Sequence, residues 1–288
     1  MKKIVYVMSV LFTGTFFACG DGAEVPVKWI GEAKETVVPA DTVNNVPQYT
    51  IVEKPQIDVS GYKKDKDGFI SIFDGKTFNG WRGYGKDNVP GRWIIENGAI
   101  KFTASGGGEA QEQDGGDIIF AHKFKNFELS IDWKVAKGAN SGIFYLAQEI
   151  KGQPIYLSAP ESQVLDNENH PDARMGQDGN RKSSSLYDMI PANPQNAKPF
   201  GEWNNTTIIV HKGTVLHQQN GKNVLEYHLW TPEWTALLQD SKFSQTKWPI
   251  AFELLNNCGG AKREGYIGLQ DHGDDVWFKN IRIKEIDF

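Results

Sequence analysis

The stretch FELSIDWK, residues 127–134, alternates apolar and polar side chains more clearly than any other part of the chain. Successive side chains of a β-strand point to opposite faces, so the four apolar residues share one face and the four polar residues share the other. A strand of this kind rests its apolar face on a core. The stretch therefore predicts a half-buried strand in a β-rich domain.

Further β-rich runs lie on both sides of this strand. Two of them read as hairpins, around Asn97-Gly98 and Asn220-Gly221, because Asn-Gly is a favoured pair in tight hairpin turns. Apolar residues have helical spacing only in residues 234–241, and that segment is short. Many short strands, Gly-containing turns and almost no helix predict an all-β fold, a two-sheet β-sandwich of jelly-roll type. Other expected strands are 117–120, 141–146, 206–210, 265–273 and 276–283.

The strand signal thins between residues 148 and 201, where polar and Pro-rich sequence clusters. This pattern predicts long loops laid over one sheet, and long loops in a compact domain usually carry function. The segment 230–260, with Trp234 and Trp248, is expected to form an insertion over one end of the domain.

Composition narrows the classes of function. The 288 residues include 12% aromatics with nine Trp, a surplus that is common in β-sandwiches and carbohydrate binders. The formal net charge is −5, with 31 Lys and Arg against 36 Asp and Glu, and this balance indicates no nucleic-acid partner. The sequence also contains no phosphate loop, no Cys-pair zinc motif, no His-Glu-x-x-His and no Gly-x-Ser-x-Gly.

The first 18 residues have the pattern of a signal peptide: Lys2 and Lys3, then an apolar run, then small residues. Ala18-Cys19 resembles a bacterial lipobox, which implies cleavage before Cys19 and a diacylglycerol thioether on its sulfur. The alternative is an ordinary signal peptide with a chance Cys. We expect a lipoprotein of the bacterial cell envelope, with residues 19–67 as a tether and residues 68–288 as the domain. With Cys19 lipidated, Cys258 alone remains, so no intrachain disulfide is possible.

The acidic stretch 161–172 is the first candidate for chemistry. Glu161 and Gln163 lie on one face if the segment is a strand, and Asp166 begins the following turn. Carboxylates beside amides suit sugar hydroxyls and proton transfer. A second possibility is a divalent cation held by Asp166, Glu168, His170 and Asp172, and a third is a solvated acidic loop without function.

Three other segments add polar candidates. Gln270 and His272 lie two residues apart in a run that reads as a strand, so they share a face that could line a cleft. The Asn140-Ser141-Gly142 entry to a strand could bind ligand or serve only as turn chemistry. Tyr187 and Trp203 could stack on sugar faces while Asp188 and Asn204 hold hydroxyls, although Trp in a sandwich is more often core.

Taken in order, these motifs resemble the 3-keto-disaccharide hydrolase domain family over roughly residue 68 to the C-terminus. The resemblance implies a concanavalin A-like jelly roll with substrate on the concave face, and cleavage of glycosides whose glucose is oxidised at C3. The matching segments are FDGK at 73–76 with Trp81, WIIENGAI at 93–100, 127–134, NSGI at 140–143, ESQVLD at 161–166, LYD at 186–188, PFGEWN at 199–204, 265–273 and FKNI at 278–281.

The chemistry of such a substrate suggests roles for the candidates. A C3 ketone acidifies the C2 proton, so cleavage by β-elimination needs a base, an acid and donors to the C3 oxygen. We expect His272 or Asp166 as the base and Glu161 as the acid or an orienting carboxylate. Asn140, Gln163 and Gln270 are expected to bind hydroxyls or the carbonyl, Asp188 to hold hydroxyls, and Tyr187 and Trp203 to shape the pocket. The alternatives are a non-catalytic carbohydrate-binding lipoprotein and a surface adhesion module.

Overall fold

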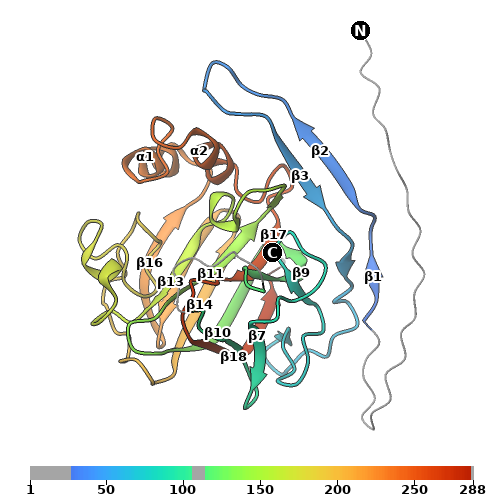
Figure 1. Ribbon diagram of the computed structural model, residues 1–288, viewed down its shortest axis with the longest axis vertical. Helices are drawn as coiled ribbons and strands as arrows, with labels where there is room; N and C mark the ends of the chain where they lie inside the picture. The colour runs from blue at the N-terminus through green and yellow to red at the C-terminus, as the bar shows by residue number, and fades with distance from the viewer. Residues whose placement is uncertain (1–26, 106–113, 287–288) are drawn as a thin grey trace.

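A computed structural model describes residues 27–105 and 114–286 and shows two large antiparallel sheets packed face to face (Figure 1). The eight-stranded sheet has the order β16-β15-β14-β10-β18-β8-β7, with β5 also paired to β18. Its strands are β5 (Ile70–Ser71), β7 (Trp93–Glu96), β8 (Ala99–Phe102), β10 (Phe127–Val135), β14 (Asn204–His211), β15 (Thr214–Gln219), β16 (Lys222–His228) and β18 (Val276–Glu285).

The five-stranded sheet has the order β13-β11-β17-β9-β6. Its strands are β6 (Trp81–Gly83), β9 (Ile118–Phe124), β11 (Asn140–Ala147), β13 (Glu161–Leu165) and β17 (Gly265–Leu269). Two sheets that sandwich one core, built from hairpins and longer crossovers, form the concanavalin A-like jelly roll, so the expected fold is confirmed.

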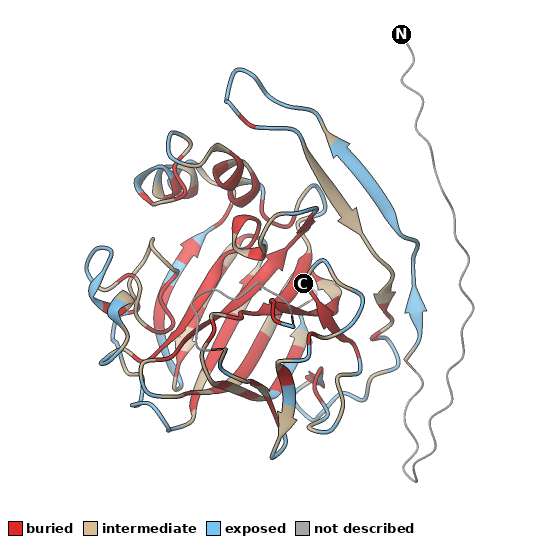
Figure 2. Cartoon of the chain, viewed as in Figure 1, coloured by how far each residue is buried: buried red, intermediate tan, exposed pale blue. Residues whose placement is uncertain are grey.

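The core between the sheets follows the alternation read from the sequence. Along β10, the side chains of Phe127, Leu129, Ile131 and Trp133 are fully buried, whereas Glu128 and Asp132 are half-exposed. Burying one large apolar side chain stabilises the fold by roughly 1.5–3 kcal/mol, so the inward face of β10 is a major source of stability. Figure 2 shows that burial is concentrated in the two large sheets.

A chain of hydrogen bonds between polar side chains crosses this core. The Nδ1 of His217 lies 2.9 Å from the carbonyl oxygen of Ser184, and its Nε2 lies 2.8 Å from the hydroxyl of Tyr145. A carbonyl can only accept, so Nδ1 carries the proton and Nε2 accepts from Tyr145. The hydroxyl of Tyr227 also hydrogen-bonds to Tyr145. The buried imidazole is therefore held in one neutral tautomer.

Residues 27–67 lie in the segment that the sequence assigns to a tether, and they form two small sheets. β1 (Trp29–Ile30) pairs with β4 (Gln56–Ile57), and β2 (Lys34–Val38) pairs with β3 (Tyr49–Glu53). β3 also pairs with β12 (Glu149–Ile150) of the domain, and Ile57 of β4 is fully buried in the main core. The hairpin β2–β3 runs along one side of the sandwich (Figure 1).

The insertion at 230–260 contains two helices, α1 (Pro232–Asp240) and α2 (Pro249–Asn256). The expected helix at 234–241 is confirmed as α1, which begins where the hydroxyl of Thr231 accepts from the amide of Trp234. The sequence missed α2, because five of its eight residues are buried and its apolar residues are not confined to one stripe. None of the helices in 27–105 and 114–286 is long and apolar enough to cross a membrane.

Two short 3₁₀ helices, η1 (Ile155–Leu157) and η2 (Pro171–Arg174), interrupt the long loops. These loops lie beside the five-stranded sheet, as expected: residues 184–187 run along the outer edge of β13, and Leu186 forms a bridge with Ser162. The connection between β17 and β18 differs from expectation. β17 ends at Leu269, so Gln270 and His272 lie in the loop after the strand and not within it.

Candidate active site

A narrow pocket lies on the face of the five-stranded sheet that points away from the core. Six of its lining residues were expected from the sequence and three were not. It is lined by Asn140, Tyr156, Glu161, Gln163, Tyr187, Lys242, Phe243, Gln270 and His272. Its free space is about 20 Å³, little more than one water molecule requires, so we expect side chains at its rim to move when a sugar enters.

The register of two strands brings the first polar side chains together. In the β11–β13 ladder, Gly142 lies opposite Gln163 and Phe144 lies opposite Glu161. Because side chains alternate, Asn140 and Gly142 of β11 share the pocket face with Glu161 and Gln163 of β13. Gly142 has no side chain, and a Cβ atom there would collide with the carboxylate of Glu161. The missing side chain therefore makes room for a carboxylate that is itself almost fully buried.

The segment 184–187 adds the phenol of Tyr187. The amide of Tyr187 donates to the carbonyl of Glu161 at 3.1 Å, which fixes its backbone beside β13. The ammonium nitrogen of Lys242 lies 4.3 Å from the centre of the Tyr187 ring. Burial raises the pKa of Tyr187 well above its usual value, and the charge of Glu161 raises it further. Tyr187 is therefore a neutral phenol, and its hydroxyl is hydrogen-bonded to Asp172.

Three buried amide atoms of this pocket make no hydrogen bond within the described protein. They are Asn140 Oδ1, Gln163 Nε2 and Gln270 Oε1. The assignment of Gln163 is anchored, because its Oε1 accepts from the amide of Val164 at 2.9 Å. A buried polar atom without a partner costs about 1–3 kcal/mol, so these atoms indicate a site built to bind the polar groups of a ligand.

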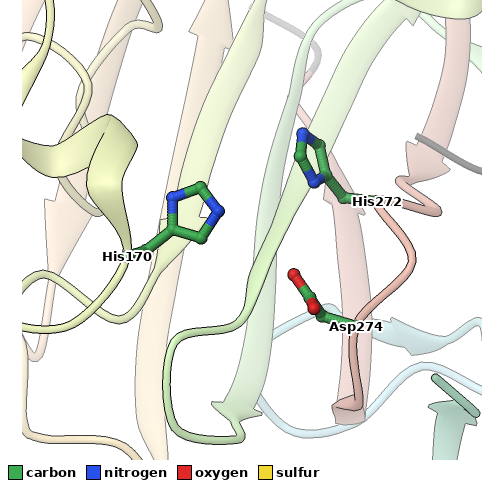
Figure 3. A group of neighbouring side chains, drawn as sticks. All are labelled: His170, His272 and Asp274. Atoms are coloured by element: carbon green, nitrogen blue, oxygen red, sulfur yellow. The ribbon is translucent and has the colours of Figure 1, made fainter. Parts of the chain in front are cut away.

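His272 also belongs to a cluster with His170 and Asp274, which Figure 3 shows pointing toward one another. One ligand atom from each residue lies within 4.8 Å of the other two. The Asp274 carboxylate accepts from the amide of Asn140 at 3.0 Å, which ties the cluster to the start of β11. Burial lowers the pKa of His170, with a further contribution from His272, and burial raises the pKa of Asp274.

Four expected site residues, Asp166, Asp188, Trp203 and Asn204, do not line the pocket. Asp166 accepts hydrogen bonds from the amides of Gly138, Glu168 and Asn169, and these bonds lower its pKa although burial works to raise it. It therefore holds the turn after β13, and the structure gives no support to its expected role as a base.

Asp188 and Trp203 have structural contacts instead. Asp188 accepts from Arg181 Nε at 2.7 Å and from the amide of Lys242 at 2.8 Å, so it fastens the insertion to the loop behind Tyr187. Trp203 lies under the ammonium groups of Lys134 and Lys279, 5.2 and 4.0 Å from its ring centre. Both lysines belong to the eight-stranded sheet, so Trp203 cannot stack on a ligand in this pocket.

The four residues of the acidic stretch that were expected to bind one cation do not lie together in the structure. Only His170 of that set joins the cluster with His272 and Asp274. Asp172 binds Arg181 Nη1 at 2.8 Å, while Asp166 is engaged with backbone amides. Sequence reasoning missed Asp274, Tyr156, Lys242 and Phe243. The last two come from the insertion, whose expected place over one end of the domain was the only signal for them.

A family model and a named relative indicate the same family, and two solved structures share the fold. A family model described as the 3-keto-alpha-glucoside-1,2-lyase-like domain matches residues 68–284. A protein of Bacteroides thetaiotaomicron named 3-keto-disaccharide hydrolase is 60% identical over the full length of both chains. A solved candidate glycosyl hydrolase from Parabacteroides distasonis is 28% identical, with a TM-score of 0.64 over 77% of this chain and 95% of that one. A second from the same organism is 25% identical, with a TM-score of 0.56 over 76% of this chain and 99% of that one.

Proposed function

Because the chain belongs to the family of the 3-keto-alpha-glucoside-1,2-lyase-like domain, we propose that it cleaves glycosides whose glucose ring carries a ketone at C3. The name of the Bacteroides thetaiotaomicron relative supports this substrate class. The observation that carries the proposal is the convergence of Glu161, His272 and three amide atoms without hydrogen-bond partners in one pocket. A sugar ketone with hydroxyls on both sides offers acceptors and donors for that set.

The reaction begins with removal of the proton at C2, which the neighbouring ketone acidifies. The electron pair of the C2–H bond forms the C2–C3 double bond of an enolate, and the negative charge moves to the C3 oxygen. When the enolate collapses, the C3 ketone re-forms, a C1–C2 double bond forms and the C1–O bond breaks. The leaving oxygen takes up one proton, so the products are an unsaturated 3-keto sugar and an alcohol. Addition of water across C1–C2 gives net hydrolysis.

The residues of the pocket match these steps. Glu161 and His272 are the groups that exchange protons with C2 and with the leaving oxygen. Lys242, whose ammonium group lies against the ring of Tyr187, supplies positive charge where the C3 oxygen becomes negative. Asn140, Gln163 and Gln270 bind ring hydroxyls through their unpaired atoms, which fixes the register of the sugar.

The test is release of aglycone from matched nitrophenyl glucosides with and without the C3 ketone. We expect turnover of the 3-keto substrate alone, with exchange of the C2 proton in deuterated water. Glu161→Gln should lower kcat/KM by roughly 100-fold or more. Glu168→Gln, in the exposed turn outside the pocket, is the matched control and should keep activity. Sugar binding without release from any 3-keto glycoside would replace the proposal with a carbohydrate-binding role.

We also propose that the mature protein is anchored in the bacterial cell envelope by lipid on Cys19. Cys19 and the signal peptide at residues 1–18 lie outside the described residues. The proposal rests on the lipobox-like Ala18-Cys19 and on the rarity of Cys, which occurs twice in the chain. Two or three acyl chains anchor a protein stably, whereas one chain does not.

A further inference from the structure

We infer that His170, His272 and Asp274 form a site for a divalent transition-metal ion in the wall of the pocket (Figure 3). His170 comes from the loop before η2, while His272 and Asp274 come from the connection between β17 and β18. Two loops that are about 100 residues apart in sequence thus bring three donor groups to one place. The catalytic part of the inference rests on the proposed function, but the binding part does not.

The donor set and its spacing fit a metal of this class. One imidazole nitrogen from each histidine and one carboxylate oxygen all lie within 4.8 Å of one another. Metal–ligand bonds of about 2.0–2.2 Å place neighbouring donors roughly 3–4 Å apart, so small side-chain movements complete the site. Two imidazoles favour Mn²⁺, Fe²⁺, Co²⁺ or Zn²⁺ over Ca²⁺ and Mg²⁺, which prefer oxygen donors. Two His and one carboxylate leave coordination positions open for substrate oxygens.

A second observation points to a ligand at the same place. Asn140 is 3% exposed, and its Oδ1 has no hydrogen-bond partner within the described protein. Its amide nitrogen donates to Asp274 Oδ2 at 3.0 Å, and its side chain lines the pocket beside His272. The backbone of Asn140 thus orients the carboxylate of the site, as outer hydrogen bonds do in metal centres. The side-chain oxygen of Asn140, Oδ1, is a fourth possible metal ligand of suitable chemistry.

His170 predicts a local rearrangement on binding. Its Nδ1 accepts from the amide of Asp172 at 3.1 Å, so the neutral ring carries its proton on Nε2. Figure 3 shows the other ring nitrogen directed toward His272 and Asp274. Ligation through Nε2 requires the proton on Nδ1, so the amide of Asp172 must release its hydrogen bond. Metal loading is therefore coupled to the backbone at the start of η2.

A cation here would assign the roles left open among the acid–base groups. It would offer Lewis acidity to the C3 oxygen of a sugar lying in the pocket. His272 would then be a ligand, and Glu161 would be the residue that accepts the C2 proton. In a β-glucoside the C2 proton and the leaving oxygen lie on the same face of the ring, so Glu161 could also return the proton; in an α-glucoside they lie on opposite faces, so the leaving oxygen would take its proton from the other side of the ring.

Binding is tested on the full mature chain after removal of metal with EDTA. Titration calorimetry with Mn²⁺ and Zn²⁺ should show one ion per chain, with weaker binding of Ca²⁺, and bound Mn²⁺ should change its electron paramagnetic resonance spectrum. His170→Ala and Asp274→Asn should each weaken Mn²⁺ binding at least tenfold. His170→Gln serves as a second variant if His170→Ala fails to fold. His228→Ala, an exposed histidine on β16, should bind as the wild type does. Absence of binding, or binding unchanged by both His170 variants, would overturn the inference.

Turnover separates this inference from the proposed function. Metal-free protein should cleave a 3-keto glucoside at least tenfold more slowly than protein reloaded with Mn²⁺ or Zn²⁺. Stoichiometric binding without turnover of any 3-keto substrate would overturn the function and leave the metal site standing. Equal turnover by metal-free protein that binds no ion would overturn the metal site and leave the function, with the three residues acting as a hydrogen-bonded acid–base cluster.

Discussion

Gly142 controls the position of the Glu161 carboxylate, because any side chain at 142 would occupy the same space. The backbone of Gly142 is extended, so alanine fits the strand, and the far end of Glu161 can swing away. We therefore expect Gly142→Ala to fold normally and to lose roughly 100-fold in kcat/KM on a 3-keto glucoside. Steady-state kinetics and thermal unfolding check the two halves of this prediction.

The control for this variant is Gly61→Ala, since a Cβ at Gly61 would meet nothing within 4 Å. That variant should match the wild type in rate and in thermal midpoint. Full activity in Gly142→Ala would show that the carboxylate of Glu161 does not need its present position.

His217 makes stability depend on pH. Burial lowers its pKa to about 4, below the ordinary value of 6.5. Between about pH 6.5 and 4, His217 is protonated in the unfolded chain but remains neutral in the folded chain. The free energy of unfolding therefore falls as the pH drops through this range. The full loss is about 3 kcal/mol for this residue. Urea unfolding at pH 7, 5.5 and 4.5 should show His217→Gln losing less stability over this range than the wild type.

His228→Gln provides the matched comparison, because His228 is exposed beside Glu226. It should keep the pH dependence of the wild type. Identical curves for the wild type and His217→Gln would contradict the assignment of this titration to His217.

Individual side chains were predictable where strand periodicity decided their direction. Alternation placed Glu161 with Gln163, and both line the pocket. Asp188 and Trp203 were not predictable in the same way, because the path of an irregular loop determines which side of the sandwich its side chains reach. Their residue types suited a sugar, but their neighbours proved to be Lys242 and the lysines of the eight-stranded sheet.

At the scale of elements, one buried ion pair joins the five-stranded sheet to the small sheet of β12, β3 and β2. Arg82 of β6 donates through Nη1 and Nη2 to both oxygens of Glu149, at 2.6 and 2.5 Å. Removing one partner leaves a buried charge alone, so Glu149→Gln should cost about 3–5 kcal/mol. The double variant Arg82→Met with Glu149→Leu should recover most of that loss, as measured by denaturant unfolding.

The exposed pair of Lys151 and Glu35 offers the contrast, because water screens it. Glu35→Gln should change stability by less than about 1 kcal/mol. If the double variant of Arg82 and Glu149 is as unstable as Glu149→Gln, the loss of stability comes from losing the ion pair and not from leaving the charge of Arg82 buried without a partner.

The insertion element forms part of the pocket wall, because Lys242 and Phe243 line the pocket. Asp188 holds the amide of Lys242 at 2.8 Å, and an amide side chain at 188 would replace one acceptor with a donor. We expect Asp188→Asn to loosen residues 241–247, with faster proteolysis there and a KM raised several-fold. Asp240→Asn, at the exposed end of α1, should change neither; unchanged proteolysis in Asp188→Asn would contradict the link.

Elements with a strong period were predicted, and elements without one were not. The FELSIDWK strand and α1 each bury one side and expose the other, so their pattern identifies them. α2 is buried on several sides, β1 and β2 are mostly exposed, and β3 is evenly half-buried, so none of them has a contrast between faces that a sequence pattern could reveal. The pocket depends on parts of the chain without a strong period, because η1, the segment 184–187, the insertion and the loop after β17 all contribute residues to its lining.

At the scale of the whole molecule, Cys19→Ser tests the proposed anchor. Loss of the thiol removes the site of lipid attachment, so the protein should move from the detergent phase to the aqueous phase in a Triton X-114 partition. Incorporation of labelled palmitate should fall to background. Cys258→Ser is the control, because that thiol is fully buried in the core. Palmitate labelling that persists in Cys19→Ser would contradict the proposal.

A lipid on Cys19 would hold the domain close to a bilayer, because the N-terminal segment is attached to the domain from Val27 onward. Val27 already packs against the main core, and β1 is paired to β4. Only residues 20–26 then separate a lipid on Cys19 from the folded body, and seven residues span at most about 25 Å. Such a short linker would keep the β-sandwich near the lipid headgroups and limit how far the domain can tilt relative to the membrane. The enzyme would then work on sugars that arrive at the membrane surface, and could not reach far from its own bilayer.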